Sequence, residues 1–205
     1  MKYKGNHLTE NRTKAERKVE ILEAALNIFV KKGYAETRMD DIVQESGLSK
    51  GAIYWHYKNK RELFLSLIDH WLDQFAPIMS PGYHAGKKAE VILKDIARFT
   101  VRIFNRNRNW FLAEIEFWAM ASRDEEVREK GIALYNGIIS EIESVLRKGI
   151  RKGEFLEIDT RQTALMLMNN LQGIIWFVLF KDETFSVDDY IKGSMEMMLR
   201  GIVKS

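Results

Sequence analysis

The sequence predicts an all-α protein in which an N-terminal module of three helices precedes a larger helical bundle, with about nine helices in all. Apolar residues recur at three- and four-residue spacing along most of the chain, and no segment alternates apolar and polar residues as a half-buried strand does. Residues that begin and end helices flank these periodic segments. Both prolines, Pro77 and Pro81, lie in one apparent break at residues 77–88.

Capping residues predict where the helices begin and end. A Ser, Thr, Asp or Asn followed three residues later by Glu or Gln satisfies free N–H groups of a first helical turn, and glycine after basic residues is typical of a helix end. The start signals are Thr13, Asn59, Ser122, Asp159 and, more loosely, Ser186, and the stop signals are Gly33 and Gly153. Together with the apolar spacing, they predict helices over residues 13–32, 39–46, 50–56, 60–76, 88–106, 109–121, 123–152, 159–181 and 187–202.

The composition is that of a globular protein. The 205 residues are 46% hydrophobic and 30% charged, which is too apolar for a disordered chain. Cysteine is absent, so disulfides and thiolate metal sites are excluded, and we expect a cytoplasmic protein. The N-terminus lacks the apolar stretch of a signal peptide. The longest apolar run, residues 163–180, contains Asn169, Asn170 and Gln172, which favours a buried helix over a membrane span.

The net charge of +3 is unevenly distributed. Residues 1–65 contain 13 Lys and Arg against 9 Asp and Glu, whereas residues 66–205 contain 19 against 20. The surplus positive charge therefore lies in the first third of the chain, where we expect a polyanionic partner to bind.

Residues 40–57 contain two short helical segments joined at Gly47. Glycine tolerates the left-handed conformation that a tight turn between helices requires, and Ser49 offers a hydroxyl to cap the second helix. This arrangement is typical of a helix-turn-helix. The apolar residues that would hold the pair together are Ile42, Leu48, Ile53 and Tyr57.

The second helix leaves an outward set of side chains that suits duplex DNA: Lys50, Gly51, Ala52, Tyr54, Trp55 and His56. Small residues let the backbone approach base edges, Tyr and His donate to phosphate oxygens, and Trp packs on thymine methyls. The alternative is that the aromatic side chains complete a small core and the lysines are solvated. An exposed aromatic pair beside a basic flank, with no apolar segment to cover it, favours DNA.

Over these residues the chain resembles the tetracycline-repressor (TetR) family of bacterial and archaeal transcriptional regulators. The motifs that carry the resemblance lie between residues 17 and 64, and length and helix count fit over the whole chain. They are Ile21-Leu22-x-Ala24-Ala25, Phe29, Lys32-Gly33-Tyr34, Thr37-x-x-x-x-Ile42, and residues 47–60 followed by Leu63.

The resemblance implies which residues contact DNA. Members typically touch bases with the second helix of the motif, which places Lys50, Gly51, Ala52 and Trp55 at base edges and matches Tyr54, His56 and Lys60 to phosphate contacts. Where the family often has Thr or Ser, this chain has Arg38, so a hydroxyl cap would be lost or moved to Thr37, while Arg38 can reach phosphate as a charge. The predicted DNA-binding surface therefore also includes Thr37, Arg38 and Ser49.

The resemblance further implies a homodimer that binds double-stranded operator DNA. Residues 1–60 would form the DNA-binding domain and residues 61–205 the ligand-binding and dimerisation domain. The last two helices of members usually form a four-helix interface with the partner, which implies Trp176, Phe180, Ile191, Met195 and Met198 as anchors. A two-fold dimer presents two recognition helices about 34–36 Å apart, so we expect an operator with an inverted repeat.

Aromatic, Met and amide side chains in the body indicate a pocket for a small-molecule effector. The predicted lining is Trp110, Glu114, Phe117, Trp118, Met166, Asn169, Asn170, Gln172 and Trp176. An elongated hydrophobic effector, such as a fatty acyl compound or an aromatic xenobiotic, is the preferred class. A lipophilic cation held by Glu114 and Glu116 is the second. For each residue, a place in the core is the alternative.

Two other classes of function compete with a ligand-responsive regulator, which we expect to be a repressor. An enzyme is disfavoured because the four histidines are scattered and no metal motif, glycine-rich phosphate loop or catalytic residue is recognisable. We therefore expect no catalytic site, no metal, no cofactor and no membrane partner. A DNA-binding protein without any effector is the remaining alternative.

Overall fold

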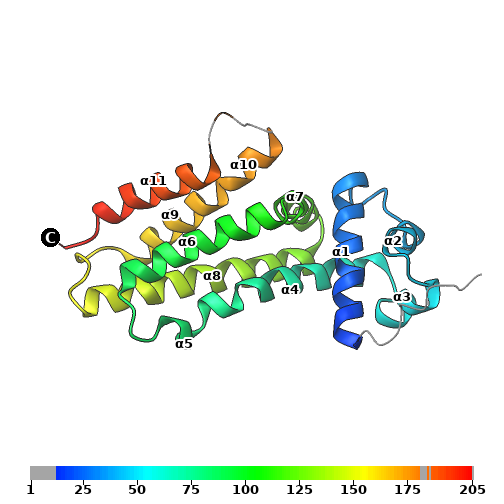
Figure 1. Cartoon of the computed structure of the whole chain (residues 1–205), viewed down its shortest axis with the longest axis horizontal. Helices are drawn as coiled ribbons and strands as arrows, with labels where there is room; N and C mark the ends of the chain where they lie inside the picture. The colour runs from blue at the N-terminus through cyan, green and yellow to red at the C-terminus, as the bar shows by residue number, and fades with distance from the viewer. Residues whose placement is uncertain (1–12, 181–183, 185, 205) are drawn as a thin grey trace, which may run out of the picture. The chain divides into compact units, whose positions relative to one another are not determined.

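A computed structural model describes residues 13–180, 184 and 186–204 and confirms the predicted all-α class. The chain divides into two compact units between His70 and Trp71. Within the described residues, none of the helices combines the length and the apolar character that crossing a membrane requires. Helix α4, Lys60–Met79, runs through the boundary, so that one helix belongs to both units (Figure 1).

The first unit consists of α1, Lys14–Lys32, α2, Met39–Ser46, α3, Lys50–His56, and the first half of α4. Thr13 and Glu16 form the predicted capping box of α1, and Gly33 ends that helix with a φ of 79°. Gly47 adopts the left-handed conformation between α2 and α3, with a φ of 66°. The core of this unit is fully buried and consists mainly of Ile21, Leu22, Leu26, Phe29, Ile42, Ile53, Leu63 and Phe64.

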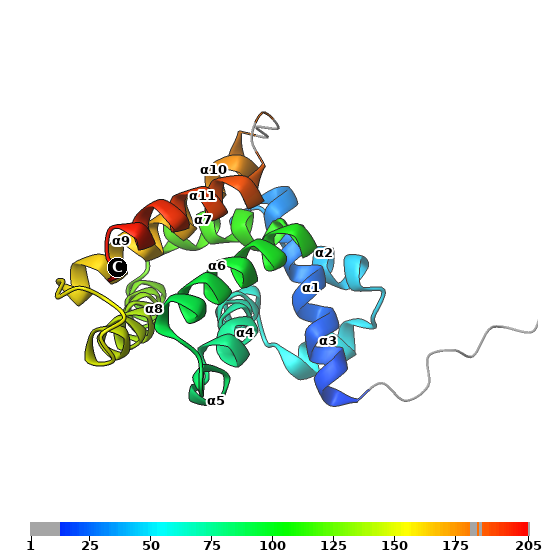
Figure 2. The ribbon, with the colours of Figure 1, turned by 60° about the vertical axis from the view of Figure 1, so that its left-hand side comes forward.

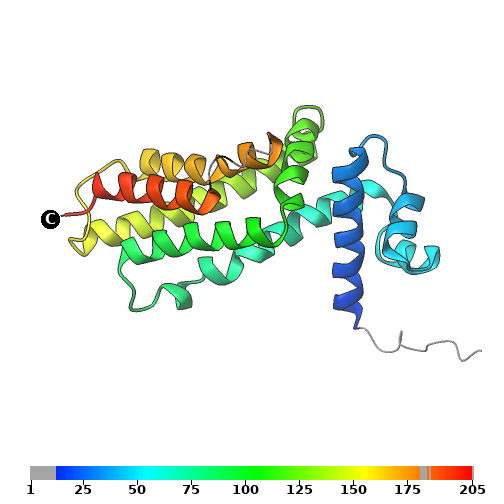
Figure 3. The same ribbon diagram turned by 45° about the horizontal axis from the view of Figure 1, so that its top comes forward.

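The second unit is a bundle built around the long helix α8. After α4 it contains α5, Pro81–His84, α6, Ala89–Arg106, α7, Asn109–Ala121, α8, Glu125–Arg151, α9, Thr160–Gln172, α10, Ile174–Leu179, and α11, Val187–Arg200. Helix α8 packs against α6, α7 and α9, and α11 packs against α6 and α9. Figure 3 shows α9 and α11 side by side, and Figure 1 shows α7 nearly end-on, so α7 crosses α8 steeply.

Three boundaries differ from the prediction. Helix α4 continues through Pro77 to Met79, so the break is shorter than the predicted residues 77–88, and it contains the single turn α5, which Ser80 caps, before α6 (Figure 2). Helix α8 begins at Glu125 because Asp124, not Ser122, accepts the cap hydrogen bond from Val127. The predicted helix over residues 159–181 consists of two helices, α9 and α10, which meet at Gly173.

Candidate functional site

The outer face of α3 is exposed, as the DNA interpretation requires. Ser49 caps the helix by accepting a hydrogen bond from the Ala52 N–H at 3.2 Å, and Ile53 anchors the inner face in the core. The side chains of Tyr54 and Trp55 are 41% and 67% exposed. They therefore do not complete a core within this unit, which was the alternative interpretation.

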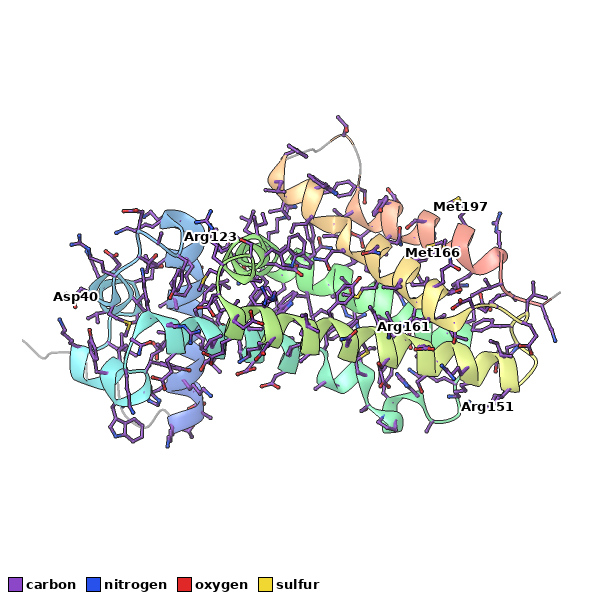
Figure 4. The ribbon with its side chains drawn as sticks, turned by 180° about the vertical axis from the view of Figure 1, so that it is seen from behind. Asp40, Arg123, Arg151, Arg161, Met166 and Met197 are labelled. Atoms are coloured by element: carbon purple, nitrogen blue, oxygen red, sulfur yellow. The ribbon has the colours of Figure 1, made fainter. Side chains whose placement is uncertain are left out.

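Lys50, at the start of α3, pairs with an acidic residue of the neighbouring helix. Its Nζ lies 2.7 Å from a carboxylate oxygen of Asp40, and both side chains are largely exposed. The hydrogen bond to Asp40 raises the pKa of Lys50, so the ammonium stays charged. Figure 4 shows Asp40 at the outer side of α2. Any DNA contact by Lys50 therefore competes with this exposed ion pair.

The beginning of α1 adds basic side chains that the sequence reasoning did not select. The Lys14 ammonium lies 4.8 Å from the centroid of the Trp55 ring. Burial lowers the pKa of His56, and the nearby charges of Lys14, Arg17 and Lys18 lower it further. Cations near the start of a helix interact unfavourably with the helix dipole. The basic residues at the beginning of α1 could therefore have indicated a binding surface in the sequence.

Thr37 and Arg38 have local roles before α2. The buried Thr37 hydroxyl donates to the Gly33 carbonyl at 2.7 Å, so it does not cap α2. The Arg38 N–H instead donates to the Asp41 carboxylate at 2.9 Å, and that carboxylate also binds Lys32 at 2.7 Å. These hydrogen bonds lower the pKa of Asp41. The Arg38 side chain remains exposed.

Lys60 is held by the turn between α1 and α2. Its ammonium donates to the carbonyl oxygens of Tyr34, Ala35 and Thr37 at 2.8, 2.8 and 2.9 Å, and it lies 4.7 Å from the centroid of the Tyr34 ring. An ammonium has three N–H donors, and all three are in use. A phosphate contact would have to displace one of these carbonyls, so this geometry makes Lys60 a structural residue of the motif.

The second unit contains a partly open cavity of about 290 Å³ between α4, α6, α7, α8 and α9. Five predicted ligand-binding residues line it: Glu114, Phe117, Trp118, Asn169 and Gln172. The prediction missed most of the wall, because apolar periodicity alone does not show which helix faces border a cavity. Phe111, which belongs to the aromatic cluster of the predicted helix 109–121, also lines the cavity, and the missed residues are Trp71, Phe75, Met79, Ile96, Thr100, Gly131, Leu134, Tyr135, Ile138, Ile142, Met168 and Leu171.

Glu114 is the one ionisable group among these lining residues, the Tyr135 phenol apart. Burial raises the pKa of its carboxyl to about 7, and a hydrogen bond from Gln172 acts in the opposite direction. No Lys or Arg is among the lining residues. The cavity can therefore offer aromatic and aliphatic surface, amide groups and one carboxyl that changes charge near neutral pH.

The other predicted ligand-binding residues lie outside this lining. Trp110 is buried and stacks on Trp71 with ring centroids 5.3 Å apart. Asn170 accepts a hydrogen bond from the Tyr190 hydroxyl at 3.2 Å. Met166 and Trp176 are 56% and 57% exposed, and Met168, not Met166, faces the cavity, because only one side of α9 turns inward.

An exposed apolar face lies on α9, α10 and α11. Trp176 and Phe180 stack with ring centroids 5.5 Å apart, and the Phe180 side chain is 71% exposed. Met166 and Met197 are exposed on the neighbouring helices (Figure 4). The other predicted dimer anchors are less accessible, because Ile191 and Met195 are buried inside their own subunit and Met198 is half-buried.

Comparison with known proteins identifies the family. The model of the bacterial regulatory proteins of the tetR family matches residues 21–67, and the model of the C-terminal domain of BetI-type transcriptional repressors matches residues 93–198. The second match alone covers more than half of the chain. The chain belongs to the tetR family of transcriptional regulators.

Individual relatives of this tetR-family regulator agree over nearly the whole chain. It is 28% identical to the uncharacterised regulator YfiR of Bacillus subtilis over 193 residues, which is 94% of each chain. It shares its fold with a regulator from Saccharomonospora viridis solved with choline, at a TM-score of 0.80 and 21% identity, over 94% of this chain and 100% of the other. It also shares its fold with FadR of B. subtilis solved with stearoyl-CoA, at a TM-score of 0.76 and 21% identity, over 89% of this chain and 98% of the other.

No metal site accompanies this surface and cavity in the described part of the chain, where no three His, Cys, Asp or Glu side chains gather as metal ligands. The candidate functional features of this tetR-family regulator are thus an exposed helix α3 in the first unit and an apolar cavity in the second.

Proposed function

We propose that this tetR-family regulator binds an operator with an inverted repeat as a homodimer and is released from it by a small hydrophobic effector. The exposed face of α3 carries the proposal. Trp55 and Tyr54 stand out from a capped helix, with Lys50 at its start and open space around Gly51. A helix with small residues, an aromatic and a cation at its tip suits base edges in a major groove.

The exposed apolar face of α9, α10 and α11 supports the homodimer. Large apolar side chains that are more than half exposed rarely gather on a monomer without a partner. Trp176, Phe180, Met166 and Met197 would be covered by the same face of a second copy, as a two-fold interface requires. Aromatic and Met side chains such as these are enriched at protein–protein interfaces.

The cavity favours a neutral aromatic effector among the hydrophobic classes. Six aromatic side chains and seven aliphatic or Met side chains line it, and a fatty acid or a coenzyme A thioester would find no cation there for its acidic group. A lipophilic cation is the second candidate, because the Glu114 carboxylate offers a negative charge among aromatic rings. Two proteins of this fold were solved with choline and with stearoyl-CoA, which are ligands of very different size and charge.

Helix α4 would carry the signal from the cavity to the DNA. Trp71, Phe75 and Met79 line the cavity at four-residue spacing, and Leu63 and Phe64 of the same helix belong to the core of the first unit. An effector that displaces the second half of α4 would move the first half with it. The two recognition helices would then no longer match successive grooves, which weakens binding.

Selection of bound duplexes from a random pool tests the proposal. We expect an inverted repeat to be enriched and native mass spectrometry to find two chains on it. Thermodynamic linkage requires the effector and the operator to weaken each other's binding by the same factor. Failure to enrich any duplex would contradict the DNA-binding function. An effector affinity that is identical with and without operator would contradict the release mechanism.

The charge of Glu114 separates the two effector classes. A cation binds the ionised carboxylate, so its affinity should rise as the pH increases through about 7 and should fall in Glu114→Gln. A neutral aromatic compound should show neither effect. Titrations of tetraphenylphosphonium and of N-phenyl-1-naphthylamine at pH values on both sides of 7 would distinguish them.

A further inference from the structure

The tip of the Phe117 ring of α7 lies against Gly131 of α8, and both residues line the cavity. A Cβ atom built on Gly131 would lie 2.8 Å from Cζ and 3.1 Å from Cε1 of that ring. Real Cβ contacts are essentially never shorter than 3.0 Å. The ring therefore occupies the space that any other side chain at position 131 would need.

Glycine is otherwise unfavourable at this position. Gly131 lies inside the helix Glu125–Arg151, where glycine is less stable than alanine because it loses more conformational freedom on folding. Gly137, six residues further along the same helix, has no atom within 4 Å of the place that a Cβ would take and so lacks any such steric reason. The difference points to a role for Gly131 in the packing of α7 on α8.

The position of the Phe117 ring bears on the size of the cavity. Phe117 is only 8% exposed, and its ring forms part of the cavity wall. It follows Glu114 by three residues on α7, which places the two side chains on the same face of the helix. A ring pushed off α8 would move into the free volume beside Glu114, because the packed helix occupies the other side.

We propose that Gly131 determines the size of the effector by letting the tip of the Phe117 ring pack closely on α8 and leaving the cavity beside Glu114 open. The inference rests on the effector cavity proposed above and adds the residue that limits the size of the effector. At about 290 Å³ the cavity is at the lower end of ligand pockets, which usually measure about 300–1,000 Å³. A shift by one methyl group therefore removes space that a large ligand needs.

Two aromatic amines of different size provide the test. 1-Naphthylamine is the smaller probe, and N-phenyl-1-naphthylamine adds a phenyl ring to it. We expect Gly131→Ala to weaken binding of the larger amine about tenfold or more, which is the usual effect of one methyl group in a tight pocket, and to leave the smaller amine little changed. Gly137→Ala, the matched control in the same helix, should bind both amines as the wild type does.

A compensating variant keeps the test independent of folding. Gly131→Ala combined with Phe117→Leu removes the ring that the new methyl group meets, so binding of the larger amine should return. Calorimetric titration gives all affinities, and thermal unfolding shows whether each variant is folded. If Gly131→Ala does not unfold cooperatively, recovery of both folding and binding in the double variant supports the proposal.

The outcomes separate this inference from the function on which it rests. If the wild type binds neither amine, the proposed effector cavity fails and the role of Gly131 fails with it. If the wild type binds both amines and Gly131→Ala binds them equally well, the cavity stands and the size-limiting role of Gly131 is overturned. Equal weakening by Gly131→Ala and Gly137→Ala would also overturn it.

Discussion

Gly51 connects local stability with DNA binding at the scale of one residue. It lies in the first turn of α3 with open space around its Cβ position, so Gly51→Ala introduces no clash within the protein. We expect the free energy of unfolding to rise by about 0.5–1 kcal/mol, because alanine is the better helix former. Affinity for the selected operator should nevertheless fall, because the methyl group enters the space that a base edge needs.

Thermal unfolding and fluorescence anisotropy would measure these two effects. Gly137→Ala, in the long helix of the other unit, is the control and should gain stability without losing affinity. Unchanged operator binding by Gly51→Ala would show that α3 does not approach the bases at this point.

His56 should make DNA binding depend on pH. Its pKa lies below the ordinary 6.5 because of burial and the charges of Lys14, Arg17 and Lys18. The folded protein thus binds this proton more weakly than the unfolded chain, and the contribution of His56 to the free energy of unfolding decreases as the pH falls below about 6.5. A phosphate beside the imidazole has the opposite effect, because it stabilises the protonated ring.

Operator affinity should therefore increase as the pH is lowered from about 7.5 to 6. In His56→Gln this increase should be smaller, which anisotropy titrations at fixed salt would detect. The same pH dependence in the variant and the wild type would remove His56 from the phosphate contacts.

Lys60 stabilises the motif through its three carbonyl contacts. Replacing it by Met leaves the carbonyl oxygens of Tyr34, Ala35 and Thr37 without this donor, so we expect a loss of about 2 kcal/mol or more in the free energy of unfolding. Denaturant unfolding measures the loss. For a lost phosphate contact, the slope of log affinity against log salt would fall by about 1. A slope change without loss of stability would restore the phosphate role of Lys60.

The sequence predicted the inner and outer faces of α3 but only part of the cavity. Trp55 was predicted to face outward because the helix-turn-helix motif fixes which residues of the short helix α3 point away from the core. The cavity depends on the rotation of each helix, which is why Met168, and not Met166, faces inward. Trp71 and Phe75 were not selected as lining residues, since apolar periodicity cannot distinguish a cavity wall from a filled interior.

At the scale of elements, capping residues predicted most helix ends well. Asp159 and Ser186 cap α9 and α11 as expected, with hydrogen bonds of 2.9 and 3.3 Å. The prediction that Ser122 caps the start of α8 was wrong, because its hydroxyl donates to the Ala119 carbonyl at the end of α7. The joint at Gly173 was missed because apolar spacing continues through it. A side chain at Gly173 would lie 2.8 Å from the Tyr190 hydroxyl.

Helix α10 supplies the test of the proposed dimer. Phe180→Asp places a charge on the stacked, exposed rings of Trp176 and Phe180, so burial against a second copy would become costly. We expect the dimer dissociation constant to rise at least tenfold, corresponding to about 1.4 kcal/mol, while thermal unfolding of the subunit changes little.

Analytical ultracentrifugation would measure the dissociation constant. Val91→Asp on α6 is the control, because Val91 is also an exposed apolar residue but lies outside the proposed interface. A Phe180→Asp protein that dimerises as strongly as the wild type would place the interface elsewhere.

At the scale of the whole molecule, charge and packing separate the proposed DNA-binding unit from the unit that contains the cavity. The excess of basic residues before position 66 accompanies the exposed helix α3, and the nearly neutral remainder contains the cavity. Sequence reasoning set the domain boundary after residue 60, whereas the compact units divide after residue 70, inside α4. A helix shared by two units has no composition break, so no sequence signal marks that boundary.

Sequence-specific reading of DNA by α3 is the central claim, and the affinity of Trp55→Ala for two duplexes tests it most directly. Trp55 is 67% exposed, so its removal should leave thermal unfolding nearly unchanged. Affinity for the selected inverted repeat should fall by about 1–3 kcal/mol, the usual effect of a lost base contact, while affinity for a scrambled duplex stays the same. Equal affinities of wild type and variant for the inverted repeat would contradict the claim.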